Sequence, residues 1–80
     1  MTVHDTAHLK QRSIERGFTI EQAIETVTAP RVIRKFPICK GEHGGFIRLF
    51  FRGYGDRVLV VVAEVKKDEY WIATAYWETP

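Results

Sequence analysis

The apolar positions between residues 18 and 28 follow a helical period. Four of them share the spacing i, i+3, i+4, i+7: Ile20, Ala23, Ile24 and Val27. This spacing places one apolar stripe along a helix. Thr19 stands at the N-cap position and Gln22 completes a capping box. Because the residue before a proline is biased away from the helical region, Pro30 predicts that this helix ends near Thr28.

A first helix is predicted ahead of it. Thr2 or Asp5 can cap this helix, which should run to about Arg16 because the stretch contains no proline or glycine. Gly17 fits the left-handed position that follows a helix end. The first third of the chain therefore reads as two consecutive helices.

Beyond Pro30 the pattern changes to a period of two, which is typical of strands. Strands are predicted over residues 31–36, 46–52, 57–65 and 70–77, with a loop at 37–45, a turn at 53–56 and a hairpin tip at 66–69. The first strand suits a sheet edge, and the β-branched run at 57–65 suits a centre buried on both faces. We expect one α+β domain over residues 1–80, with two N-terminal helices packed on one face of a three- to four-stranded antiparallel sheet.

Two helices can cover only one face of such a sheet. Simple alternation places Phe50, Trp71 and Trp77 on the uncovered face, where they would expose more apolar area than a monomer usually does. This favours a homodimer or a protein partner on that face. The alternative is a platform on which single-stranded nucleic acid stacks its bases.

Composition and charge narrow the classes of protein. With 45% apolar and 28% charged residues, the chain is typical of a globular protein. No apolar run approaches the roughly 18–20 residues that span a bilayer, and the first residues lack a signal-peptide pattern, so we expect no membrane association and a cytoplasmic location. A lone cysteine, Cys39, permits no internal disulfide.

The net charge of +2 is unevenly distributed. Residues 31–57 contain seven basic and two acidic residues, a local charge of +5. A basic segment favours an anionic partner such as RNA. The candidate nucleic-acid contacts are Arg34, Lys35, Arg48 and Arg52.

Histidine and arginine recur every four residues along the first helix, at His4, His8, Arg12 and Arg16. An imidazole can transfer protons near neutral pH, and guanidinium groups can hold a phosphate. This grouping suits metal-independent cleavage of a phosphodiester, with Thr74 and Tyr76 as hydroxyl groups on the last strand. The alternative is a solvated helix face whose arginines pair with nearby glutamates.

Other motifs point to no metal and no cofactor. His4 and His8 have the i, i+4 spacing of a metal-binding pair, but no third ligand suggests itself. The glycine-rich run from Lys40 to Gly45 lacks the ending of a phosphate-binding loop. We interpret it as a flexible hairpin connection with a solvated His43.

The segment His8-x-x-x-Arg12-x-x-x-Arg16-Gly17-Phe18-Thr19, with Pro30 further on, resembles a family of small bacterial and phage domains of unknown function. That family is related to the RelE/ParE-type toxins and the barnase/colicin-like nuclease superfamily. The closing Thr74-Ala75-Tyr76 is similar to the family's last strand.

The resemblance implies a ribonuclease-like or ribonuclease-derived site. His8 would be its acid or base, Arg12 and Arg16 would bind phosphate, and Thr74 and Tyr76 would line the cleft. It also implies an antitoxin-like protein partner and a mobile or prophage element as the source. The first functional hypothesis is thus a toxin-like, nucleic-acid-directed domain, either a metal-independent ribonuclease or a derivative that has lost activity. The alternative is a non-catalytic interaction module that dimerises or docks a partner through the outer aromatic face.

Overall fold

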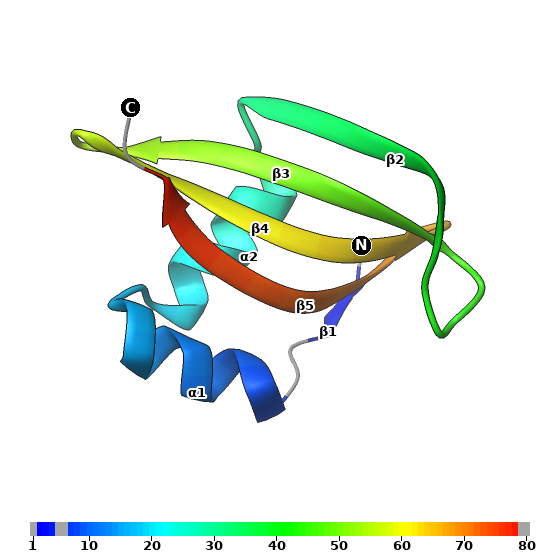
Figure 1. Ribbon diagram of the computed structural model, residues 1–80, viewed down its shortest axis with the longest axis horizontal. Coiled ribbons are helices and arrows are strands. Elements are labelled where there is room, and N and C mark those ends of the chain that lie inside the picture. Colours follow the sequence, from blue (N-terminus) through cyan, green and yellow to red (C-terminus); the bar gives the residue numbers. More distant parts are fainter. Residues whose placement is uncertain (1, 5–6, 79–80) are drawn as a thin grey trace.

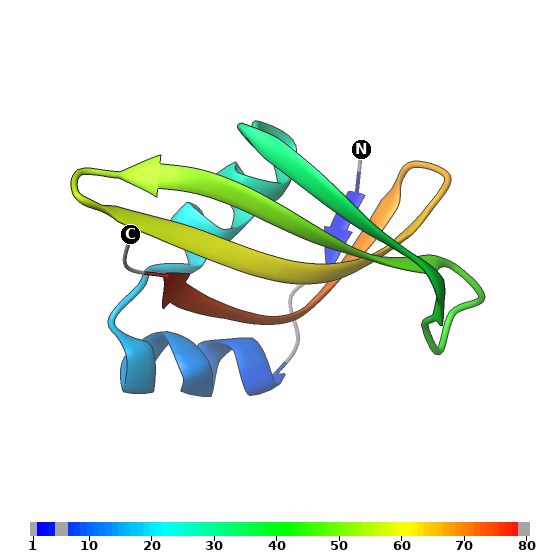
Figure 2. The same ribbon diagram turned by 45° about the horizontal axis from the view of Figure 1, so that its top comes forward.

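The computed structural model describes residues 2–4 and 7–78, with the side chains of residues 7 and 34–39 outside the described set. Its elements are β1 (Thr2–His4), α1 (Ala7–Arg16), α2 (Ile20–Thr28), β2 (Val32–Lys40), β3 (Phe46–Tyr54), β4 (Arg57–Lys66) and β5 (Glu69–Glu78). The five strands form one sheet in the order β1-β5-β4-β3-β2 (Figure 1). Helix α1 runs alongside β5, whereas α2 packs on β4 and β3 (Figures 1 and 2).

The α+β class and the two N-terminal helices are confirmed, but the sheet has five strands, not three or four. The additional strand, β1, pairs in parallel with the start of β5, where Thr2 lies opposite Glu69. The other neighbouring strands pair antiparallel. Thr2 therefore belongs to a strand, and its prediction as a helix cap is wrong. The other predicted cap, Asp5, lies outside the described residues.

The predicted start and end of α2 are confirmed. Thr19 Oγ1 accepts a hydrogen bond from the Gln22 backbone at 3.0 Å, and Gln22 Oε1 accepts one from the Thr19 backbone at 2.9 Å. This capping box satisfies N–H groups that have no partner inside the helix. Gly17 has φ +72°, so the connection between the helices uses the left-handed conformation that the sequence predicts.

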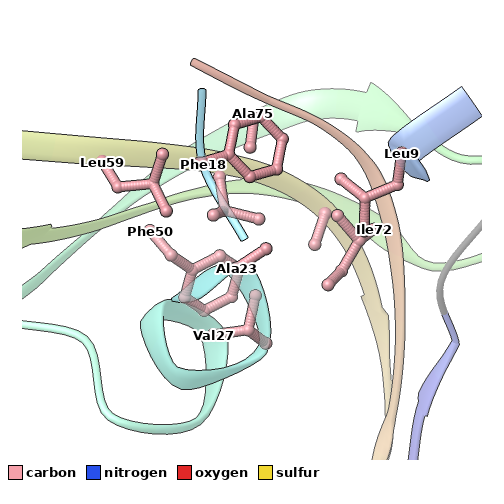
Figure 3. Close-up of a cluster of buried hydrophobic side chains, with 10 residues drawn as sticks. Leu9, Phe18, Ala23, Val27, Phe50, Leu59, Ile72 and Ala75 are labelled. Atoms are coloured by element: carbon pink, nitrogen blue, oxygen red, sulfur yellow. The ribbon is translucent and has the colours of Figure 1, made fainter. Parts of the chain in front are cut away.

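The core lies between the helices and one face of the sheet. Figure 3 shows the Phe50 ring beside Ala23 and Val27 of α2, and Phe50 is 2% exposed. The prediction that Phe50 lies on the uncovered face is therefore wrong. Phe50 is paired with Val61 of β4, whose side chain is buried in the same cluster. Both alternating sets of β3 contain large apolar residues, so the alternation alone does not identify the inner set.

A β-bulge in β5 decides which aromatic residues face the helices. The ladder with β4 skips Ala73, because Val62 is opposite Thr74 while Ala63 is opposite Ile72. An extra residue on one strand reverses the alternation beyond it. Trp77 consequently packs against the core, and its Nε1 donates to the Gly17 carbonyl at 3.4 Å. The prediction that Trp77 lies on the outer face is wrong.

The connection between β2 and β3 is shorter than predicted. Strand β2 occupies the sheet edge, as expected, but it continues to Lys40 with a shift of register after Lys35. Extended backbone thus covers four of the nine residues of the predicted loop at 37–45. The remaining turn, residues 41–45, folds back toward β4 and β5.

Candidate functional site

The turn at residues 41–45 is built around a buried carboxylate. Glu64 of β4 accepts hydrogen bonds through Oε2 from the backbone of His43 at 2.9 Å and of Gly45 at 2.7 Å. Its Oε1 lies 3.0 Å from Nδ1 of the His43 imidazole. The Glu64 side chain is 6% exposed, whereas that of His43 is 44% exposed. The carboxylate therefore fixes both the backbone of the turn and an accessible imidazole.

Two glycines permit this close approach. A Cβ at Gly41 would overlap the Glu64 carboxylate, and a Cβ at Gly45 would lie 2.5 Å from the Val65 carbonyl oxygen. The glycine-rich composition predicts a flexible connection, but two of these glycines are required because a side chain would not fit at their positions. The prediction of a solvated His43 agrees with its 44% exposed side chain, but the ring also contacts the Glu64 carboxylate, which the prediction did not include.

Trp71 supplies the surface on which His43 rests. The His43 and Trp71 rings are parallel to within 4°, with centroids 4.1 Å apart. His4 of β1 is also nearly parallel to Trp71, at a centroid distance of 5.3 Å, and its Nε2 lies 3.3 Å from Glu69 Oε1. Trp71 is opposite Glu64 in the β4–β5 ladder, so the imidazole reaches both residues. The outer position predicted for Trp71 agrees with this geometry.

His8 of α1 lines the same pocket as this His43–Glu64 pair. The pocket has a volume of about 310 Å³ and lies between α1, β5 and the turn. It is lined by His8, Gly41, Glu42, His43, Ile47, Glu64, Trp71, Ile72 and Ala73. Two imidazoles from segments that are distant in sequence therefore border one hollow. General acid–base chemistry uses such an arrangement when two proton transfers occur at one reacting centre.

The hydrogen bonds to Glu64 favour its ionised form. Burial opposes ionisation and by itself raises the pKa of Glu64. The hydrogen bond from the His43 imidazole and those from the Gly45 and His43 backbones outweigh it, so the pKa of Glu64 lies below its usual value. A charged Glu64 can only accept hydrogen bonds, so the atom facing it, His43 Nδ1, carries a proton. In the neutral imidazole, Nε2 is then left as a proton acceptor.

Part of the predicted catalytic group does converge. Arg16 Nη1 donates to Thr74 Oγ1 at 3.1 Å and to the Ala75 carbonyl at 2.8 Å, so the end of α1 is tied to β5. Arg12 instead pairs with Glu15 of its own helix at 3.0 Å. Tyr76 is 38% exposed on the outer side of the sheet. Of these five predicted residues, His8 lines the pocket; the roles of all five stay predictions.

The predicted nucleic-acid contacts occupy different surroundings. Arg48 lies over the Phe46 ring at 5.3 Å. Arg52 faces α2, where Nη1 donates to the Ala29 carbonyl at 2.7 Å and Nε lies 3.3 Å from Glu25 Oε1. The contact between Arg52 Nε and Glu25 Oε1 does not have hydrogen-bond geometry, so it is an ion pair without a hydrogen bond. The side chains of Arg34 and Lys35 lie outside the described residues.

Sequence reasoning missed the pairing of His43 with Glu64, although one signal was available. Glu64 is an acidic residue in the apolar run of a strand predicted to be buried on both faces. A buried carboxylate requires hydrogen-bond donors. The nearby glycine-rich turn, which carries a histidine, offers such donors.

Within residues 2–4 and 7–78, no helix is long and apolar enough to cross a membrane. Over the same ranges, no three potential metal-ligating side chains of histidine, cysteine, aspartate or glutamate lie together.

Comparison with known proteins identifies one family. Searches of curated proteins and of solved structures gave no significant match. A family model described as a domain of unknown function, DUF4258, matches residues 6–77, which is nearly the whole chain. The resemblance to RelE/ParE-type toxins and nucleases gains no support from these comparisons. The chain belongs to the DUF4258 family.

Proposed function

We propose that this protein is a toxin-like, metal-independent ribonuclease whose site is the pocket bordered by His8 and His43. The observation that carries the proposal is the buried Glu64 carboxylate, which holds the accessible His43 imidazole at the same hollow that His8 lines. A carboxylate that orients an imidazole and fixes its tautomer is a recurrent device in acid–base catalysis. The antitoxin-like partner and the mobile-element source implied by the resemblance belong to the same proposal.

The chemistry follows from the two histidines. His43 Nε2 takes the proton from a ribose 2′-hydroxyl, and that oxygen attacks the adjacent phosphorus. His8 gives a proton to the departing 5′-oxygen. The products are a 2′,3′-cyclic phosphate and a 5′-hydroxyl. This division of roles assigns the base to the imidazole that Glu64 holds, because the carboxylate stabilises the cation formed by proton uptake.

Charge outside the pocket supports an anionic substrate. The net charge of +2 and the basic segment at residues 31–57 favour association with a polyanion. The Lys66 ammonium lies beside Gly44, at the turn that carries His43. A phosphate held at the rim beside this turn would have the Lys66 ammonium as a nearby positive charge.

The test compares RNA cleavage by four versions of the full chain, with EDTA present: wild type, His8→Gln, His43→Gln and His4→Gln. His4 is the matched control, since it is the third histidine of the chain and does not line the pocket. Loss of either pocket histidine should lower the rate about 10²–10⁴-fold. His4→Gln should retain cleavage. Equal integrity of RNA with wild type and with His43→Gln overturns the enzymatic proposal.

A second candidate function is a non-catalytic interaction module. The sheet face opposite the helices carries Val32, Phe51, Val60 and Tyr76 in one row across four strands, and Val32 is 51% exposed. Tyr76 at the other end of the row is 38% exposed, whereas Val60 between them is buried. The exposed apolar residues at the two ends suit dimerisation or a protein partner. Sedimentation equilibrium tests it: the mass should rise with concentration and Tyr76→Lys should abolish the rise. If the wild-type protein stays monomeric at high concentration, the dimer hypothesis is refuted.

A further inference from the structure

The pocket between the two histidines has the wrong charge for a phosphate. Its described lining includes two carboxylates, those of Glu42 and Glu64, and neither lysine nor arginine. The remaining walls come largely from apolar or aromatic side chains, including Ile47, Trp71 and Ile72. An anion placed inside would meet negative charge without a strong counter-charge, whereas a flat neutral group would meet apolar walls. The interior therefore suits an uncharged ring.

The size of the hollow suits a single ring system. Its volume of about 310 Å³ is near the lower end of the roughly 300–1,000 Å³ typical of small-molecule sites. A phosphate attached to the ring would then remain at the rim, where the His43 side chain is 44% exposed. This arrangement separates the neutral and the charged parts of a nucleotide.

The bulge places a residue without a ladder partner at the same pocket. Ala73 is skipped by the β4 ladder, and the parallel pairing with β1 ends at Trp71. In the described part of the chain, Ala73 therefore has a strand partner on neither side, and it lines the pocket. Backbone N–H and C=O groups outside a ladder can bond to the edge of a heterocycle. Bulges are frequent beside active sites, where they redirect a side chain or end the strand pairing.

We infer that the pocket lined by Ile47, Trp71 and Ala73 is a subsite for one nucleobase of single-stranded RNA. The inference rests on the proposed function and adds its substrate class: the base lies inside the pocket, and the scissile phosphate lies at the rim beside His8 and His43. A base buried in this way must be unpaired, so duplex RNA is a poor ligand.

Binding can be measured without cleavage by using a deoxydinucleotide, which lacks the attacking 2′-hydroxyl. Methyl-detected NMR of the full chain should show saturable shifts at Ile47, Ile72 and Ala73. An abasic counterpart with the same phosphate should bind about tenfold more weakly, since one stacked base contributes on the order of 1–3 kcal/mol. Equal affinity for the two probes, or shifts confined to residues outside the pocket, overturns the inference.

A pair of variants locates the ring. Ala73→Leu fills the pocket and should weaken the deoxydinucleotide about tenfold or more. Ala29→Leu, the same change at an exposed alanine that does not line the pocket, is the matched control and should bind as wild type does. Unchanged affinity in a folded Ala73→Leu protein overturns the inference. If that variant does not fold, the affinities of the wild-type protein for the two probes decide the question instead. Base-dependent binding without any RNA cleavage would refute the proposed catalysis alone. RNA cleavage by a protein that binds the two probes with equal affinity would refute this inference alone.

Discussion

Glu64 and His43 are 21 residues apart in sequence, yet Glu64 Oε1 lies 3.0 Å from His43 Nδ1. The same carboxylate accepts from two backbone N–H groups of the turn. One side chain of a central strand therefore sets both the shape of the turn and the position of its imidazole. Stability and proposed chemistry should respond together when this carboxylate is changed.

Glu64→Ala should be strongly destabilising. The substitution leaves the buried Gly45 N–H and the His43 N–H without their acceptor. Each unsatisfied donor costs about 1–3 kcal/mol, so the free energy of unfolding should fall by about 2–6 kcal/mol. Urea denaturation measures the change. Glu64→Gln keeps an acceptor oxygen and should lose less; equal losses for the two variants would contradict this explanation.

The Glu64 carboxylate should also make stability depend on pH in acid. Its pKa in the folded protein lies below the ordinary value near 4.5. The resulting stabilisation is therefore complete above about pH 4.5 and is lost as the pH falls through the folded-state pKa. The difference in unfolding free energy between wild type and Glu64→Gln should shrink over that acidic range. A difference that stays constant down to the lowest pH at which both fold would contradict the assignment.

Gly41→Ala should open the turn. The new Cβ would overlap the Glu64 carboxylate, so either the turn or the glutamate must move. Hydrogen exchange at Gly45, whose N–H binds Glu64, should become faster. Gly55→Ala is the control: Gly55 has φ +66° but no atom within 4 Å of the new Cβ. It should cost about 1–2 kcal/mol through backbone strain and leave exchange at Gly45 unchanged relative to neighbouring amides.

Two aromatic truncations should report which face of the sheet is covered. Phe50→Ala removes a ring that is 2% exposed and should cost about 3–5 kcal/mol. Tyr76→Ala removes a ring that is 38% exposed and should cost much less. Thermal or chemical denaturation at one fixed protein concentration distinguishes them. Comparable losses would mean that the outer face is covered in solution, which is the outcome expected for a dimer.

The parts of the fold that the sequence predicted correctly are those encoded locally. The box of Thr19 and Gln22, the apolar stripe and Pro30 all lie within one short segment, so they define α2 without tertiary information. Strand β1 has no such signal, because its three residues are extended by pairing with β5 at the far end of the chain. Local propensity does not reveal a partner that distant.

The candidate site was harder to predict because it depends on contacts across the sheet. His8 could be selected from its chemistry, and it does line the pocket. His43 could be recognised only through Glu64, whose burial follows from the position of β4 at the centre of the sheet. The interaction of Arg16 with Thr74 likewise depends on where α1 lies beside β5. Residue spacing gives none of these distances.

The extra residue at Ala73 has a consequence for comparing this chain with its relatives. Before the bulge the even-numbered residues point inward, and after it the odd-numbered residues do. Ile72 and Ala75 are therefore both buried although they are three positions apart. A homologue that lacks the bulge would need a gap at this point for its inward side chains to correspond. Without that gap, an alignment would place Trp77 opposite a solvent-facing residue of the homologue. Inward and outward positions would then be exchanged over the whole end of β5.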